Sequence, residues 1–411
     1  MTLKTLLTGN EAAAWAARLA DVDYVPGYPI TPQTEIIETL AHWIRDGKLK
    51  AKFVTMDSEH SMVTAAGAAS ATGARVFTTS SSQGFLYSYE MLFNLSGWRV
   101  PVVMANVSRA LSAPITLEPD HNDVLSARDA GFIQIHCETV QEILDSILMA
   151  FRISEDERIL LPSIVNFDGF YLSFTREIVD VPEENEVREF LPPYVPKHAF
   201  ISSRQPMVQG AAVLNASLYS YFRYQLHLAA ENALTVYGEV AQEYRRKFGR
   251  DLSPIEKFMM RDAEYAIVMI GSFATKGKKA VTLMREKGMK VGLTKLRLLR
   301  PFPAQELIEA LSGLKGIAVI DQNISPGKGG VLFSELTSAL YNLKQKPVAL
   351  SFIGGLGGKD ISQAEFEFAL NKTISTEEGK QTLQMAPILL FTQTDDEIVR
   401  RMLAIGHGET E

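Results

Sequence analysis

The sequence predicts an α/β protein with two domains, each built on a parallel sheet covered by helices. Short apolar runs rich in Val, Ile and Phe alternate with amphipathic stretches before residue 175, and the same alternation resumes near Asp262. A segment rich in Pro and Glu lies between the two parts. Strands that alternate with helices are typical of βαβ units, in which parallel strands are joined by crossover helices.

In the first domain, polar or Gly/Pro residues bound each apolar run, which favours buried strands. The expected strands are Asp23–Pro26, Lys52–Met56, Arg75–Thr79, Pro101–Asn106, Gly131–His136 and Ile159–Asn166. Apolar residues recur at spacings of three and four in the intervening stretches, which predicts amphipathic helices. The clearest are Thr31–Arg45 and Glu138–Ser154.

Residues 177–206 are expected to be an extended crossing segment, because prolines and glutamates crowd there. Residues 207–248 are rich in Tyr and Ala and lack Pro, so we expect a long helical stretch. We interpret its stripe of apolar and aromatic residues as a packing face rather than a ligand site; the stripe is Leu214, Leu218, Tyr221 and Tyr224. Both segments are assigned to a first domain spanning residues 1–255.

A second, smaller α/β domain is expected over residues 262–400. Its strands are predicted at Tyr265–Gly271, Lys290–Leu293, Gly316–Ile320 and Ala349–Ile353. Its helices are predicted at Ala274–Lys287, Ala304–Leu314 and Leu332–Leu343. The charged tail after Thr394 is expected to carry one short amphipathic helix.

Composition excludes several classes of protein. The 411 residues carry a formal net charge of −7, which argues against a nucleic-acid binder. The single cysteine, Cys137, excludes a disulfide framework, a cysteine-built zinc site and an iron–sulfur cluster held by this chain alone, and we expect an inert core thiol. Because the sequence shows neither a signal-peptide pattern nor a long uncharged apolar run, we expect a cytoplasmic protein.

Common cofactor motifs are missing. The nearest candidate for a phosphate loop, beginning at Gly271, has its second glycine one residue late and lysine where serine or threonine belongs. Two incomplete GxGxxG patterns, at Gly327 and Gly355, lack the third glycine, and neither HExxH nor GxSxG occurs. His60 and His121 lack metal-ligand spacing, so no metal site is predicted.

Ligands of open α/β sheets bind beyond the carboxyl ends of the strands, and three such positions carry unusual residues. In the first, Thr31 lies between two prolines where a helix should begin. A structural explanation is that Thr31 caps the helix and Pro32 is its first residue. In the second, Glu59 follows a strand within Met56–Ser61; a buried carboxyl could bind a ligand ring there, or Asp57 or Ser58 could cap the helix.

In the third position, Arg109 follows an apolar strand in a loop of small residues. Its guanidinium fork could bind a carboxylate, or it could form a structural ion pair with Asp120 or Asp123. The polar run Thr78–Gln83, followed by Gly84, could bind a cofactor or could be an ordinary turn.

Taken together, these segments resemble the α subunit of the 2-oxoacid:ferredoxin oxidoreductases, the pyruvate synthase family. In the first domain the matching segments are Gly9-Asn-Glu-Ala12, Tyr28-Pro-Ile-Thr-Pro-Gln33, Ser58-Glu-His-Ser61, Ser80–Gly84, Asp120-His121 with Asp123-Val124 and Arg128, and Asn166-Phe-Asp-Gly169. In the second they are Arg300-Pro-Phe-Pro303, Asp321-Gln-Asn323, Gly327–Gly330 and Gly354–Asp360. The similarity covers nearly the whole chain in the right order.

The resemblance implies a thiamine-diphosphate enzyme, with a pyrimidine-binding domain followed by a transketolase C-terminal-like domain. It implies a partner β subunit that holds the diphosphate, Mg²⁺ and a [4Fe–4S] cluster. It also implies γ and ferredoxin-like δ subunits, coenzyme A, and ferredoxin or another electron acceptor. The missing cofactor motifs and the single cysteine fit this division of labour, because the other half of the site would come from partners.

The resemblance also implies residue roles. Glu59 matches the glutamate that hydrogen-bonds N1′ of the aminopyrimidine and so promotes loss of the thiazolium C2 proton. Arg109 matches an arginine that faces the substrate carboxylate, and Thr31 a hydroxyl near the same oxygens. Cofactor contacts are implied for Pro29, Ile30, Ser82 and Gln83 in addition to Glu59.

The loop Thr116–Asp123 departs from pyruvate-type relatives, which tend to carry an aromatic residue before this stretch. Pyruvate, branched-chain, aryl and other 2-oxoacids therefore all remain open as substrates. Two further functions are considered: a thiamine enzyme without redox centres, of the transketolase or decarboxylase kind, and a non-catalytic assembly subunit on the same fold.

Overall fold

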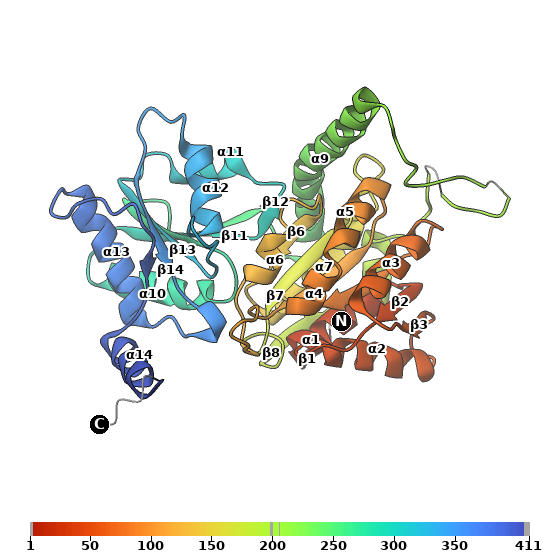
Figure 1. Cartoon of the computed structure of the whole chain (residues 1–411), viewed down its shortest axis with the longest axis horizontal. Coiled ribbons are helices and arrows are strands. Elements are labelled where there is room, and N and C mark those ends of the chain that lie inside the picture. Colours follow the sequence, from red (N-terminus) through yellow and green to blue (C-terminus); the bar gives the residue numbers. More distant parts are fainter. Residues whose placement is uncertain (1–2, 198–199, 205, 407–411) are drawn as a thin grey trace. The chain divides into compact units, whose positions relative to one another are not determined.

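The computed structural model describes residues 3–197, 200–204 and 206–406, and it divides into two compact units (Figure 1). Unit 1 contains the chain up to Glu256, together with Ile270–Ser272 and Lys295–Glu306. Unit 2 contains Lys257–Met269, Phe273–Thr294 and the chain from Leu307 onward. Helices and strands alternate in both units, so the α/β class predicted from the sequence is confirmed.

Unit 1 is built on a sheet with the strand order β12-β6-β7-β5-β4. Strands β4, β5, β7 and β6 pair in parallel, whereas β12 is antiparallel to β6. A parallel pair, β2 with β3, adjoins β4 through a bridge between Tyr24 and Val76, and β1 pairs antiparallel with β8. The carboxyl ends of the parallel strands β3, β2, β4, β5 and β7 therefore lie along one edge.

The elements of unit 1, in chain order, are β1 (Leu3–Thr8), α1 (Gly9–Leu19), β2 (Tyr24–Gly27), α2 (Thr34–Arg45), β3 (Lys52–Thr55), α3 (Glu59–Ser70), β4 (Phe77–Ser80), α4 (Ser82–Tyr87), α5 (Tyr89–Trp98), β5 (Val103–Ser108), α6 (Asn122–Ser126), β6 (Ile133–His136), α7 (Val140–Ser154), β7 (Ser163–Asp168), β8 (Arg176–Val181), α8 (Glu184–Phe190), α9 (Ala216–Phe248) and β12 (Leu298–Arg300).

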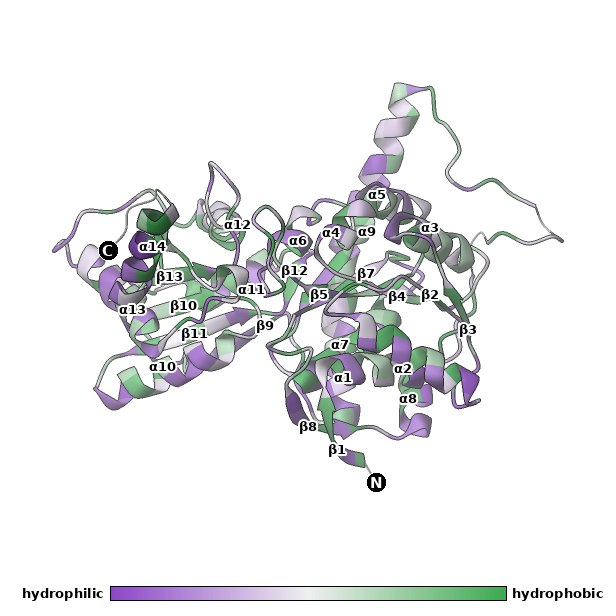
Figure 2. Cartoon of the chain, turned by 60° about the horizontal axis from the view of Figure 1, so that its bottom comes forward, coloured by the Kyte–Doolittle hydropathy of each residue, from purple (hydrophilic) through white to green (hydrophobic). Residues whose placement is uncertain are grey.

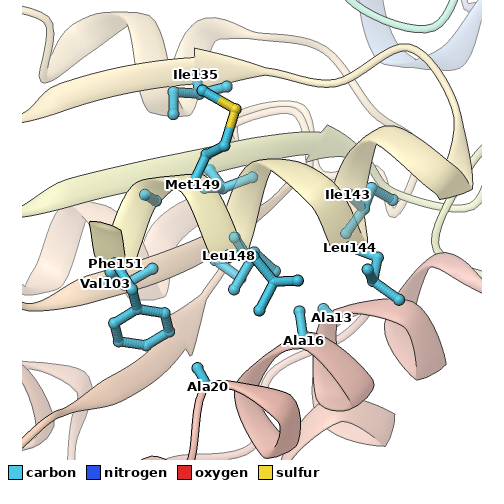
Figure 3. Packing of buried hydrophobic residues seen from close by; sticks show 14 of the residues in the cluster. Ala13, Ala16, Ala20, Val103, Ile135, Ile143, Leu144, Leu148, Met149 and Phe151 are labelled. Atoms are coloured by element: carbon cyan, nitrogen blue, oxygen red, sulfur yellow. The ribbon is translucent and has the colours of Figure 1, made fainter. Parts of the chain in front are cut away.

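The core of unit 1 lies where α7 packs between the sheet and α1 (Figure 3). Helix α1 presents small residues, Ala13 and Ala16, and this lets α7 approach closely with Leu144 and Leu148. Each fully buried leucine or isoleucine contributes roughly 1.5–3 kcal/mol to folding. This core fixes the sheet, and the sheet in turn fixes the loops at its carboxyl edge.

Unit 2 is built on a sheet with the strand order β15-β14-β13-β10-β11-β9, in which β10, β13, β14 and β15 pair in parallel. Its elements, some of which begin or end in residues of unit 1, are β9 (Ile255–Phe258), β10 (Tyr265–Met269), α10 (Ala274–Glu286), β11 (Val291–Leu296), α11 (Ala304–Leu311), β13 (Gly316–Asp321), α12 (Val331–Leu340), β14 (Val348–Ile353), the 3₁₀ turn η1 (Leu356–Gly358), α13 (Gln363–Glu377), β15 (Ile388–Leu389) and α14 (Gln393–Gly406). The short amphipathic helix expected after Thr394 is present as α14.

The expectation that residues 177–206 form one extended segment is wrong for its first half. Strand β8 begins at Arg176 and pairs along its length with β1, and α8 follows it. The glutamates that suggested an unpacked segment instead start the helix, because Glu183 and Glu186 form a reciprocal capping box. Helix α8 then buries Val187 and Phe190.

The helical stretch expected at 207–248 is also shorter than predicted. Helix α9 begins at Ala216, where the Asn215 side chain accepts a hydrogen bond from Leu218 N at 3.1 Å. The predicted packing stripe is wrong, because Leu214, Leu218, Tyr221 and Tyr224 are all exposed. The buried face of α9 lies further along; it consists of Leu226, Ala229, Ala233, Val236, Tyr237, Val240, Ala241 and Tyr244. The first turns of α9 extend beyond the helices that cover the sheet of unit 1 (Figures 1 and 2).

Cys137 is buried, as predicted, and burial raises the pKa of its thiol. A thiol that resists deprotonation is a poor nucleophile, which agrees with an inert core residue. Among the described residues, no helix combines the length and the apolar character needed to cross a membrane.

Candidate active site

The candidate site lies at the carboxyl edge of the sheet in unit 1, where four consecutive parallel strands end. Ile30 and Thr31 follow β2, Glu59 follows β3, Gln83 follows β4 and Arg109 follows β5. Because these strands are neighbours in parallel, their following loops meet at one edge. Contacts between these side chains and loops define two neighbouring groups.

The first group contains Glu59, Gly84 and Ile30. A Cβ atom placed on Gly84 would lie 2.1 Å from Glu59 Oε1 and 2.9 Å from Ile30 Cδ1. The carboxyl group therefore rests directly against the backbone of α4, where only glycine leaves it room. Glu59 is 6% exposed, yet within the described residues its carboxyl group accepts no hydrogen bond.

Glu59 is also the first residue of α3, and the capping interpretation of this segment is confirmed for Ser58. The Ser58 hydroxyl accepts a hydrogen bond from Ser61 N at 3.2 Å. Helix capping and ligand binding are compatible here, because Ser58 makes the cap and the Glu59 carboxyl group takes no part in it. The N-terminal end of a helix also favours a negative charge at this position.

The second group contains Arg109, Gln83 and Thr31. Arg109 is 8% exposed; its Nη1 donates to the Thr31 carbonyl oxygen and its Nη2 donates to Gln83 Oε1, both at 2.8 Å. The ion pair with Asp123 considered as an alternative is not formed within the described chain, because the Asp123 carboxylate accepts from the Arg109 backbone N rather than from the guanidinium. Burial lowers the pKa of Arg109, and the nearby charge of Asp123 opposes this shift.

Thr31 does not cap a helix, so that structural alternative is wrong. Helix α2 begins at Thr34, three residues later, because Gln33 bends back and donates from Nε2 to the Tyr28 carbonyl oxygen at 2.8 Å. Asn10 of α1 further fixes the loop by donating to the Pro32 carbonyl oxygen at 2.9 Å. Thr31 is exposed, and Pro29 in the same loop is exposed too.

Ser82 and Gln83, both predicted cofactor contacts, have bonds within the chain. The hydroxyl of the buried Ser82 lies 2.9 Å from the Ala110 carbonyl oxygen and 2.5 Å from Gln83 Oε1. Gln83 is half-buried and joins Arg109 to the next loop, since its Nε2 donates to Ser112 Oγ at 2.9 Å. Both residues therefore contact the Arg109 group rather than the Glu59 carboxyl group.

Behind these loops lies a buried ion pair that the sequence analysis did not predict. His121 Nε2 and Asp168 Oδ1 are 2.7 Å apart, and Asp168 also accepts a hydrogen bond from Ser272 N at 3.1 Å. Burial alone would lower the pKa of His121, but the Asp168 carboxylate, with Asp123 and Asp120, raises it. Histidine and aspartate are far apart in the sequence, so spacing gave no signal of this pair.

A second buried cluster, remote from the loops above, joins Glu138 and Glu142 to two cations. Lys295 Nζ lies 2.5 Å from Glu138 Oε2 and 2.7 Å from Glu142 Oε1, and Arg297 Nη2 also lies 2.7 Å from Glu142 Oε1. With Glu256, these carboxylates are close enough together to suggest a metal site. Lys295 Nζ lies within 2.9 Å of a carboxylate oxygen of all three glutamates, and Arg297 also pairs with Glu142, so cations already occupy the cluster and we interpret it as structural.

Two family models match the chain, in the same order as its two units. One, described as the thiamine-diphosphate-binding domain of pyruvate flavodoxin/ferredoxin oxidoreductase, matches residues 15–242. The other, described as core domain II of pyruvate:ferredoxin oxidoreductase, matches residues 263–366. Together they account for most of the sequence.

Curated relatives agree with these matches. The chain is 43% identical over 371 residues to the pyruvate synthase subunit PorA of Pyrococcus abyssi, covering 90% of this chain and 94% of the relative. It is also 43% identical over 364 residues to the ketoisovalerate oxidoreductase subunit VorA of the same organism, covering 88% of this chain and 91% of the relative.

Solved structures show the same fold at lower identity. The 2-oxoglutarate:ferredoxin oxidoreductase of Magnetococcus marinus, solved with 2-oxoglutarate, coenzyme A and succinyl-CoA, matches 91% of this chain with a TM-score of 0.69 and 17% identity. This chain spans 65% of the length of that one. A split-gene transketolase, described as an inactive β4 tetramer, matches 90% of this chain with a TM-score of 0.54 and 12% identity.

Proposed function

The chain belongs to the 2-oxoacid:ferredoxin oxidoreductase family, and from this we propose that it is the subunit that binds the pyrimidine end of thiamine diphosphate in a CoA-acylating 2-oxoacid oxidoreductase. The enzyme would convert pyruvate or a related 2-oxoacid and coenzyme A to an acyl-CoA and CO₂. The observation that carries the proposal is the Glu59 carboxyl group, which is buried without a hydrogen-bond donor among the described residues and lies beside the Arg109 group.

The residues at the sheet edge fit the aminopyrimidine ring of the cofactor. The Glu59 carboxyl group is largely shielded from water and has no donor among the described residues, so a ligand can offer it a hydrogen bond that this chain does not. A ring nitrogen that shares a proton with Glu59 would supply that bond, and the bare backbone of Gly84 lets the carboxyl group lie directly against α4. Ile30 offers an apolar contact on the same side. Pro29, Ser82 and Gln83 complete the proposed cofactor contacts.

Thiamine diphosphate, when bound, supplies the carbon nucleophile and the electron sink that decarboxylation of a 2-oxoacid requires. The role of this chain is to hold and transfer one proton at a carboxyl oxygen of Glu59. Arg109 would bind the substrate carboxylate, because its fork matches two carboxylate oxygens and its present partners are both neutral. The Thr31 hydroxyl would lie near the same oxygens.

Partner subunits would complete the enzyme. Relatives of this chain are named as subunits, and its single cysteine cannot ligate an iron–sulfur cluster by itself. We therefore expect a β subunit with the diphosphate and Mg²⁺ site and a [4Fe–4S] cluster, together with γ and ferredoxin-like δ subunits. Electrons would pass to ferredoxin or another acceptor, in the cytoplasm.

The test is to purify the chain with its partners and to measure viologen reduction with pyruvate, 2-oxoisovalerate, an aryl 2-oxoacid and 2-oxoglutarate. We expect reduction that requires thiamine diphosphate, coenzyme A and one class of 2-oxoacid. Decarboxylation without viologen reduction would instead support a transketolase- or decarboxylase-like enzyme. Turnover that is indifferent to changes at both Glu59 and Arg109 would support a non-catalytic assembly subunit.

A further inference from the structure

We propose that Asp123 is a positioning residue for the 2-oxoacid, because its carboxylate binds both of the backbone segments that present Gln83 and Arg109. The inference rests on the function proposed above, in which Arg109 binds the substrate carboxylate. Asp123 would thereby join the site that binds the substrate. The sequence alone suggested only an ion pair between Asp123 and Arg109.

The Asp123 carboxylate is completely buried and accepts hydrogen bonds from two loops of the site. Its Oδ2 accepts a hydrogen bond from Ser82 N at 3.0 Å and another from Arg109 N at 3.2 Å. Ser82 directly precedes Gln83 in the sequence. One oxygen atom therefore joins the loop after β4 to the loop after β5. These are the loops whose side chains meet in the hydrogen bond between Arg109 Nη2 and Gln83 Oε1.

Further donors fix the carboxylate itself. Asn106 Nδ2 lies 3.2 Å from Oδ2, while Ser108 Oγ and Val124 N lie 3.1 and 2.7 Å from Oδ1. Asn106 Nδ2 of β5 also donates to Asn166 Oδ1 of β7, and the single Ser108 hydroxyl hydrogen is shared between Asn166 Oδ1 at 2.7 Å and Asp123 Oδ1, so the carboxylate is anchored to the centre of the sheet. An acceptor held by rigid strands can set the position of the two loops that it contacts.

Asparagine has the same shape at this position but cannot replace the carboxylate. If its amide nitrogen took the place of Oδ2, it would face the N–H groups of Ser82, Arg109 and Asn106. If it took the place of Oδ1, it would face Val124 N. Either orientation sets donor against donor: the first displaces the loops directly, and the second moves the side chain away from Val124 N, and with it the acceptor atom that the two loops share. A shift of the Arg109 loop moves the guanidinium away from Thr31 and Gln83, and an anion bound there loses its paired donors.

A double-mutant cycle in the purified complex tests this role. Asp123→Asn should raise KM for the 2-oxoacid by about tenfold while kcat changes less than about threefold, because ground-state binding is lost. In an Arg109→Met background the same change should have less than about a twofold effect, because there is no guanidinium left to position.

Asp145→Asn is the matched control, since Asp145 is also buried and multiply hydrogen-bonded but lies in α7 against Arg250 and Tyr244. It should lower the melting temperature and leave KM unchanged. If Asp123→Asn does not fold, Ser108→Ala is the substitute, because it removes one donor to the carboxylate. It should raise KM by a smaller factor than Asp123→Asn, and this rise should disappear in the Arg109→Met background.

The positioning role is overturned if Asp123→Asn changes KM by the same factor in both backgrounds, or if it leaves KM unchanged in the wild-type background. Either result would leave the proposed function intact. An unchanged KM in Arg109→Met alone would overturn the substrate role of Arg109, and with it this inference.

Discussion

Glu59 and Glu142 are both acidic residues largely removed from solvent in unit 1, but their surroundings differ. Glu142 receives hydrogen bonds from Lys295 and Arg297, and although burial opposes ionisation, these cations hold the pKa of Glu142 well below its usual range. Glu59 has no such partner within the described residues. A buried acid paired within its own chain cannot lose its cation without a large cost in stability, whereas one without an internal partner is available to a group from outside.

The largest expected effect is on catalysis at Glu59. Glu59→Gln should lower kcat by roughly 10²–10⁴-fold, because the amide cannot transfer the proton. The free energy of unfolding should stay within about 0.5 kcal/mol or rise, since no internal bond is lost. Viologen reduction and denaturant unfolding measure the two quantities, with the exposed Glu90→Gln as control. Turnover close to wild type would contradict the role assigned to Glu59.

The opposite result is expected at the neutralised cluster. Lys295→Met keeps the side-chain volume but leaves Glu138 without the cation beside it, and it should lower the free energy of unfolding by about 3–5 kcal/mol. The folded fraction should retain the wild-type KM, because Lys295 pairs with Glu138, Glu142 and Glu256, which are not among the proposed site residues. If Lys295→Met instead changed KM without lowering the free energy of unfolding, the distinction drawn between Glu59 and Glu142 would be wrong.

Arg109→Lys should have an intermediate effect. A lysine keeps the charge but cannot donate hydrogen bonds to Thr31, Gln83 and a carboxylate at the same time. We therefore expect KM for the 2-oxoacid to rise about 10–100-fold, with a smaller fall in kcat. Initial-rate kinetics over a range of 2-oxoacid concentrations measure this. The substrate assignment fails if KM is unaffected.

The smallest effect should be the pH dependence of the His121–Asp168 pair. Since the folded pKa of His121 is raised, its stabilisation is complete below the unfolded pKa of about 6.5 and is lost as the pH rises through the folded value. The pKa of Asp168 is lowered, so its own contribution is lost only in acid. His136 stays neutral throughout, because burial lowers its pKa to about 3.

We therefore expect the free energy of unfolding to fall as the pH rises above about 6.5, more steeply in the wild type than in His121→Asn. Urea unfolding at a series of pH values measures the slopes. Equal slopes in the two proteins would show that the pair does not carry this dependence.

Local patterns in the sequence predicted strands β2–β7, β10, β11, β13 and β14 and helices α2, α7, α9–α12 and α14 near their observed positions, but not β1, β8, β9, β12 or β15. For example, Glu138–Ser154 was expected as a helix, and α7 begins at Val140 and ends at Ser154. Patterns failed where structure depends on distant partners. Strand β8 pairs with β1 at the other end of the domain, and the prolines near it concealed that pairing.

The candidate site likewise has features that the sequence predicts and features that depend on contacts between distant segments. The pattern of strands and helices placed Glu59 and Arg109 at strand ends and the resemblance implied their roles, so the sequence determined which charged groups the site offers. Only the tertiary structure decided that the Arg109 guanidinium meets Thr31 and Gln83 rather than Asp123, and that Asp123 joins their loops. Hydrogen-bond partners in a folded chain are selected by distances of about 3 Å between loops that are remote in sequence, and residue spacing carries no record of those distances.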